Sequence, residues 1–194
     1  MKANPHPDLA LPNEVWAGKQ KNIVLGSKII ELHYVGMSHG LGMTVSLLPK
    51  EKVSYIADIV TPNRVMFTIV PDFNIGEWQK VLGNVEKMDF DTSIFSHSHA
   101  KEPFGTMQDI TQTREYIEDL QAAIIAEFNQ GTAFEDIPGR ISLEKYKHWV
   151  GYDDLATNER FACNPRHVDG SIPLATRSRL RVRDSPSELD LPPR

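Results

Sequence analysis

The spacing of apolar and polar residues predicts strands in the first third of the chain. Apolar, strand-like runs cover residues 21–25, 28–35, 43–48 and 53–59. The pair Gly26-Ser27 joins the first two runs, and the short polar segment 49–52 joins the last two. Because short polar connections favour antiparallel neighbours, we expect a series of antiparallel hairpins here.

The pattern then changes to helical spacing. Apolar residues recur at helical intervals over 78–88 and again over a longer stretch, 106–129, for which Thr106 is a suitable N-cap and Gly131 a suitable C-terminal glycine. A short buried strand is expected at 91–95 and a further helix at 143–150. Strands followed by helices that alternate with a strand predict an α/β (α+β layered) domain, in which helices lie on one face of a mostly antiparallel sheet.

The amino-acid composition indicates where the folded domain ends. A chain of 194 residues with 40% hydrophobic and 24% charged residues is typical of one folded domain, which we place at 1–160. Arginine and proline accumulate over 161–194 while the apolar periodicity stops, so we expect a disordered tail there. No segment is apolar for ~18 residues, and no membrane span is expected.

Charge and cysteine content narrow the classes of function. The net charge of −5 argues against a general nucleic-acid or anionic membrane surface. Cys163 is the single cysteine, which excludes an internal disulfide and a cysteine-based zinc cluster. One unpaired cysteine suits a reducing compartment, and we expect a cytoplasmic protein.

Four side chains that could bind a metal follow strand-like runs. His39 lies in a glycine-rich loop, Asp58 lies in an apolar run, and His97 and His99 follow the strand at 91–95. Imidazole and carboxylate groups at strand ends can meet at one sheet edge and hold a cation. Other interpretations stay open: a loop histidine without a partner, a hydrogen-bonded or capping aspartate, and one histidine ligand with a bystander.

The order and spacing of these residues resemble a known family. The stretch 35–60, which contains Gly36, His39 and Asp58, and the later Phe95-Ser96-His97-Ser98 are similar to motifs in the C-terminal half of metallo-β-lactamase-fold hydrolases. The resemblance runs from about 7–154. It implies half of an αβ/βα sandwich and the hydrolysis of an ester, thioester, lactone or similar bond in a small-molecule substrate by a metal-bound hydroxide.

The resemblance also implies roles for individual residues. His39 would bind the first of two zinc ions, Asp58 would be the catalytic carboxylate that bridges them, and His97 would bind the second. His99 is an additional candidate ligand. Iron and manganese are alternatives to zinc, because the same ligand types suit all three.

One family motif is absent from its expected place. The His-x-His-x-Asp-His motif should precede His39, but that part of the chain contains only His6 and His33. The segment that begins at Ser96 starts like this motif, but Lys101 stands where the aspartate belongs, and an ammonium group repels a dication. We therefore expect a truncated enzyme with at most weak zinc binding and little or no hydrolysis.

An alternative interpretation is a non-catalytic remnant of the same fold that acts as an interaction module. Part of a sandwich leaves one apolar sheet face uncovered. Such a face would form a homo-oligomer or bind a complementary N-terminal half.

Overall fold

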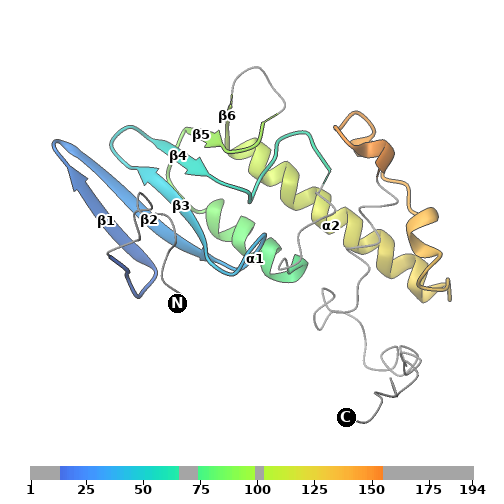
Figure 1. The fold of residues 1–194 in the computed structure, drawn as a ribbon. Helices are drawn as coiled ribbons and strands as arrows, with labels where there is room; N and C mark the ends of the chain where they lie inside the picture. Colours follow the sequence, from blue (N-terminus) through green and yellow to red (C-terminus); the bar gives the residue numbers. More distant parts are fainter. Residues whose placement is uncertain (1–13, 66–73, 99–102, 155–194) are drawn as a thin grey trace, which may run out of the picture.

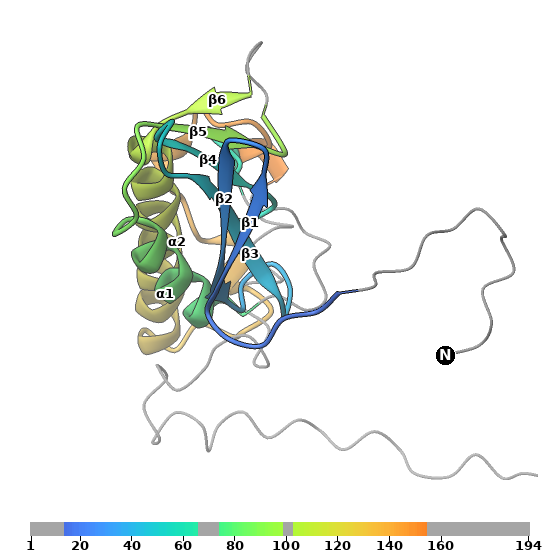
Figure 2. The ribbon, with the colours of Figure 1, turned by 90° about the vertical axis from the view of Figure 1, so that its left-hand side faces the viewer.

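The computed structural model describes residues 14–65, 74–98 and 103–154. Within these residues one sheet of six strands carries both α-helices on the same face (Figures 1 and 2). The strands are β1 (Gln20–Leu25), β2 (Lys28–Gly36), β3 (Met43–Leu48), β4 (Val53–Ile56), β5 (Thr92–Phe95) and β6 (Phe104–Gly105). The helices are α1 (Ile75–Val85) and α2 (Met107–Asn129), and three 3-10 turns follow: η1 (Ile137–Gly139), η2 (Glu144–Tyr146) and η3 (Tyr152–Asp154). The predicted α/β layered class is confirmed.

The strands lie in the sheet in chain order, and all neighbours are antiparallel except β4 and β5. The mostly antiparallel sheet was therefore predicted correctly. The one parallel pair has α1 in its connection, as a crossover between parallel strands requires. As a consequence β2, β4 and β5 run in the same direction and end at the same edge of the sheet.

The core lies between the sheet and the two helices. Val45, Ile56 and Phe95 form one cross-strand row on the helix-facing side, and none of them is more than 2% exposed. The neighbouring row contains Ser54 and Ser93, whose hydroxyl oxygens are 2.6 Å apart and fully buried. Because each buried hydroxyl satisfies the other, the pair fixes the β4–β5 register without an unpaired polar group.

Local signals in the sequence account for the ends of α2. The Thr106 side chain accepts a hydrogen bond at the first turn, and the Asp109 carboxylate accepts one from the Thr106 backbone N–H at 2.8 Å. This capping box confirms Thr106 as the N-cap. Gly131 follows the helix with φ +85°, a left-handed conformation that glycine adopts without strain.

The strand predicted at 53–59 is shorter than expected. It ends at Ile56, because Asp58 adopts φ +60° and the Ile59 N–H donates to the Ala57 carbonyl at 2.8 Å. This tight turn takes the chain out of the sheet.

The helix predicted at 143–150 is wrong. Only the 3-10 turn η2 forms, and Tyr146 and Trp149 pack against Tyr116 of α2 with ring centroids 5.1 and 5.3 Å away. Val150 then donates its N–H to the Asn63 carbonyl at 2.9 Å, which is incompatible with a continuing helix. Burial, together with a hydrogen bond to a carboxylate of α2, raises the pKa of Tyr146 to about 12.

Other expectations lie outside the described residues. These are the tail at 161–194, His99 and Cys163. Within the described ranges, no helix combines the length and the apolar character needed to span a bilayer.

Candidate functional site

The shared direction of three strands brings the predicted ligands to one edge of the sheet (Figure 1). His39 lies in the loop after β2. Asp58 and His97 each lie two residues beyond the paired positions Ile56 and Phe95, which end β4 and β5. Because the two strands are parallel and in register, equal distances beyond the pair bring these two side chains together.

Asp58 and His97 form the centre of the site. The Asp58 Oδ1 and His97 Nε2 atoms are 2.8 Å apart, and the two side chains are 36% and 55% exposed. The Ser96 hydroxyl accepts a hydrogen bond from the Asp58 backbone N–H at 3.0 Å and donates one to Oδ1 at 3.2 Å. The carboxylate is therefore held from two sides but stays open to a ligand from solvent.

The backbone of Asp58 is strained. Its φ of +60° lies in the left-handed region of the backbone, which residues other than glycine seldom adopt. Such strain persists only where the surrounding structure fixes it, and it is concentrated at functional positions. Here the Ser96 contacts and the turn at Ile59 fix it.

Helix α1 contacts the His39 loop and the turn after Asp58. The Trp78 ring lies edge-on to His39 with centroids 6.3 Å apart, and its Nε1–H donates to the Ile59 carbonyl at 2.9 Å. The N-cap of α1, Asn74, donates its backbone N–H to the Ser38 carbonyl at 3.1 Å. One helix therefore contacts both the loop that carries His39 and the turn that carries Asp58.

That all the predicted ligands meet at one metal ion stays a prediction. In the part of the chain that the structure describes, no three histidine, cysteine, aspartate or glutamate side chains are grouped closely enough to hold a metal ion. Asp58 and His97 meet. His39 makes a ring contact with Trp78, and His99 lies outside the described residues.

The donors that do meet fit a zinc ion as two of its ligands. Zinc–ligand bonds of about 2.0–2.2 Å at tetrahedral angles separate neighbouring donor atoms by roughly 3.3–3.5 Å. The 2.8 Å between Asp58 Oδ1 and His97 Nε2 therefore needs to widen by only a fraction of an ångström. In addition, Ser38 Oγ is buried beside His39 without a hydrogen-bond partner among the described residues, which indicates that this loop is built to receive a further polar atom.

Comparisons with known proteins identify the fold of this chain. A sec-alkylsulfatase from Pseudomonas sp., described as stereoselective and inverting, superimposes with a TM-score of 0.66 and 17% identity over 82% of this chain and 27% of that chain. The chain has the metallo-β-lactamase fold. A metallo-β-lactamase from Pontibacter korlensis matches with a TM-score of 0.49 and 17% identity over 56% of this chain and 50% of that chain.

One curated relative matches at the level of sequence. The 2,4-dinitroanisole O-demethylase subunit alpha of Nocardioides sp. (strain JS1661) is 30% identical over 82 residues, which are 42% of this chain and 25% of that protein. No protein-family model matches. The chain thus spans about a quarter of the length of the sulfatase and of the demethylase subunit.

Sequence reasoning missed the role of Ser96. From the sequence alone, this serine had no task beyond its place next to His97. The structure shows that its hydroxyl positions Asp58 through two hydrogen bonds. A hydroxyl next to a candidate histidine ligand was the available signal, but its partner is 38 residues away in the chain.

We predict that Asp58→Gly is more stable than Asp58→Ala by about 1 kcal/mol, because only the alanine keeps a side chain in the left-handed conformation. Both variants remove the carboxylate, so the difference in their free energies of unfolding, measured by chemical denaturation, reports the backbone strain reduced by the larger unfolded-state entropy of glycine. Ala57→Gly is the control, and it should be less stable than the unmodified chain. If Asp58→Gly is less stable than Asp58→Ala by as much as Ala57→Gly is less stable than the unmodified chain, the position is unstrained.

Proposed function

We propose that this chain supplies ligands to the metal centre of a hydrolase that acts on a small-molecule ester or a similar oxygen-linked bond. The observation that carries the proposal is the Asp58–His97 pair, which lies at adjacent, parallel strand ends of a metallo-β-lactamase fold. Zinc is the metal we propose, because one imidazole nitrogen and one carboxylate oxygen are among its ordinary ligands.

The names of two similar proteins support the class of bond. One is a sec-alkylsulfatase and the other is an O-demethylase subunit. Both names describe the release of an alkyl group from oxygen. We therefore include sulfate esters and alkyl ethers beside the ester, thioester and lactone bonds that the resemblance implies.

Each residue of the site has a distinct task in this proposal. Asp58 and His97 would hold the metal, with His39 and His99 as further ligands, and Ser96 would keep the Asp58 carboxylate oriented while the metal binds. A bound zinc ion would supply a hydroxide at neutral pH and polarise the bond to be cleaved. The partial exposure of both side chains leaves the site open to substrate.

The described residues supply too few ligands for catalysis. A catalytic zinc site uses three protein ligands and a water, and here only two candidate donors meet. We propose that His39, together with His99 and other groups outside the described residues, completes the set of ligands, and that the chain by itself binds zinc weakly and hydrolyses little or nothing.

We predict that His97→Ala weakens zinc binding by on the order of tenfold or more, because even groups that only support a ligand change affinity by about 10–100-fold. Isothermal titration calorimetry of the full chain measures this, and Asp58→Asn should have a similar effect. His148→Ala is the matched control, because His148 is an exposed histidine outside the site. His39→Ala then tests whether a third ligand shares the ion. Equal zinc affinity in the His97→Ala, Asp58→Asn and control variants would contradict the proposal.

One observation favours the interaction module as a second candidate. On the sheet face opposite the helices, one cross-strand row consists of Leu32, Ser46, Tyr55, Ile94 and Phe104, and its two large exposed apolar side chains are Tyr55, 42% exposed, and Phe104, 54% exposed. Figure 2 shows α1 and α2 on the other face. We infer that this face packs against the same face of a second copy, because exposed apolar rows on a sheet mark contact surfaces.

We predict that the full chain dimerises with rising concentration and that the double variant Tyr55→Thr/Phe104→Thr stays monomeric. Size-exclusion chromatography with light scattering measures the mass. The control is Val24→Thr/Ile29→Thr, a matched pair of exposed residues on the opposite face of the β1–β2 hairpin, which should leave the dimer intact. Dimerisation should persist in EDTA, because the row contains no candidate metal ligand. A wild-type chain that is monomeric at every concentration would exclude self-association through this face.

A further inference from the structure

A cavity lies away from the Asp58–His97 pair, between the β1–β2 hairpin and α1. Its volume is about 510 Å³, within the range of small-molecule sites. One wall consists of Lys19, Gln20 and residues 33–36 of β2, and the other consists of α1 and Met88, which follows that helix. It shares no lining residue with the candidate metal ligands.

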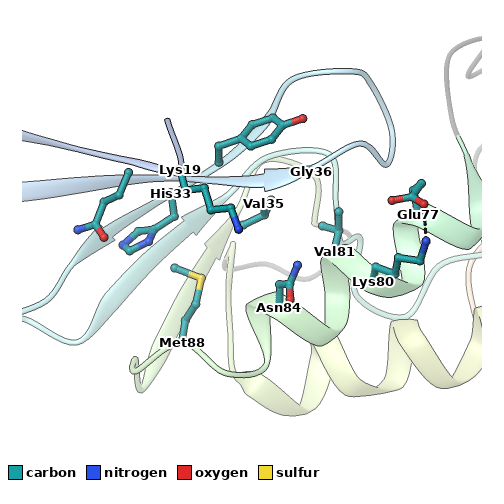
Figure 3. A pocket seen from close by; sticks show the side chains of 11 residues that line it. Lys19, His33, Val35, Gly36, Glu77, Lys80, Val81, Asn84 and Met88 are labelled. Carbon is teal, nitrogen blue, oxygen red and sulfur yellow. Dashed lines mark hydrogen bonds and ion pairs between the residues drawn. The ribbon is translucent and has the colours of Figure 1, made fainter. Parts of the chain in front are cut away.

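The cavity exists because β2 touches α1 at one end and diverges from it at the other. At Gly36 the strand lies so close to the helix that a Cβ atom would be 3.2 Å from Val81 Cγ2, and the residue adopts φ +118°. Toward His33 the hairpin extends past α1, which leaves a space between strand and helix (Figures 1 and 3).

Lys19 supplies a positive charge to this cavity. Of the other groups near it, Lys80 pairs with Glu77 on α1, and the His33 ring contacts the Glu31 carboxylate at 2.9 Å. Among the described residues no carboxylate forms an ion pair with the Lys19 ammonium group. Lys19 therefore remains able to pair with an anion that enters the cavity.

The backbone of Lys19 is anchored beside the cavity. The Lys19 carbonyl accepts a hydrogen bond from the Tyr34 N–H at 2.8 Å, which anchors the residue to the edge of β2. In Figure 3 the Lys19 side chain extends from the strand side toward α1, while Asn84 and Met88 extend from the helix side toward the sheet. A cation and an amide therefore face the same space.

The floor of the cavity is apolar. Val35 and Val81 line it with 8% and 1% of their surfaces exposed, and the Met88 thioether lies beside them. An ammonium group and an amide above a buried aliphatic floor match an anionic head on an aliphatic body. We propose that this cavity binds a small aliphatic carboxylate, with the carboxylate on Lys19 and Asn84 and the chain on Val35, Val81 and Met88.

The proposal does not depend on a metal, so it can be tested separately from the hydrolase. Sodium octanoate is the probe, and octan-1-ol and octylammonium have the same chain with a neutral and a cationic head. Methyl NMR of the full chain follows the signals of Val35, Val81 and Met88 during each titration. We expect saturable shifts of these methyl groups with octanoate, binding on the order of tenfold weaker with octan-1-ol, and weaker still with octylammonium.

Two lysine variants of equal charge complete the experiment. Lys19→Met should reduce octanoate affinity to that of octan-1-ol and leave octan-1-ol binding unchanged. Lys87→Met removes the same charge at the end of α1 but does not line the cavity, and it should behave like the unmodified chain. The proposal is overturned if octanoate shifts none of these methyl groups, binds no better than octan-1-ol, or loses the same affinity in both variants.

Discussion

The parallel pairing of β4 and β5 is the constraint on which the candidate site depends. Antiparallel neighbours would send the two strand ends to opposite edges of the sheet, and Asp58 and His97 would then be separated by the length of a strand. The register that pairs Ile56 with Phe95 instead carries both side chains to one edge, where they meet at 2.8 Å. The buried Ser54–Ser93 pair helps to fix this register from inside the core.

Helix α1 links the core to the site. Val81, Leu82 and Val85 are buried against the sheet, while Trp78 reaches from the same helix to the Ile59 carbonyl and to the His39 ring. The same helix also forms one wall of the cavity below Lys19. A change in the position of α1 would therefore move the His39 loop and the Asp58 turn and would reshape the cavity at the same time.

The sequence predicted the elements well where local signals decide them. The strand at 43–48 and the capping of α2 by Thr106 follow from alternation and cap chemistry, and the structure confirms both. The early end of β4 was not predictable, because it depends on the left-handed Asp58 and on a contact with Ser96 from a distant loop. The segment 143–150 has the apolar content of a helix and was wrongly predicted as one. Its aromatic side chains Tyr146 and Trp149 are instead buried by packing on Tyr116. For the site, the sequence placed Asp58 and His97 after strand-like runs, and the structure brings the two side chains to within 2.8 Å. Their role as metal ligands stays a prediction, and the convergence of His39 depends on tertiary distances that periodicity does not contain.

The central claim is that the hydrogen-bonded Asp58–His97 pair is a metal-binding pair. Nitrogen-15 NMR of the histidine rings, recorded while zinc is added to the full chain, tests this most directly because it reports on the Nε2 atom that faces the carboxylate. The account predicts that the His97 Nε2 resonance shifts first and saturates, while the His148 resonances stay in place. An unchanged His97 ring at saturating zinc, or equal shifts at His97 and His148, would contradict it.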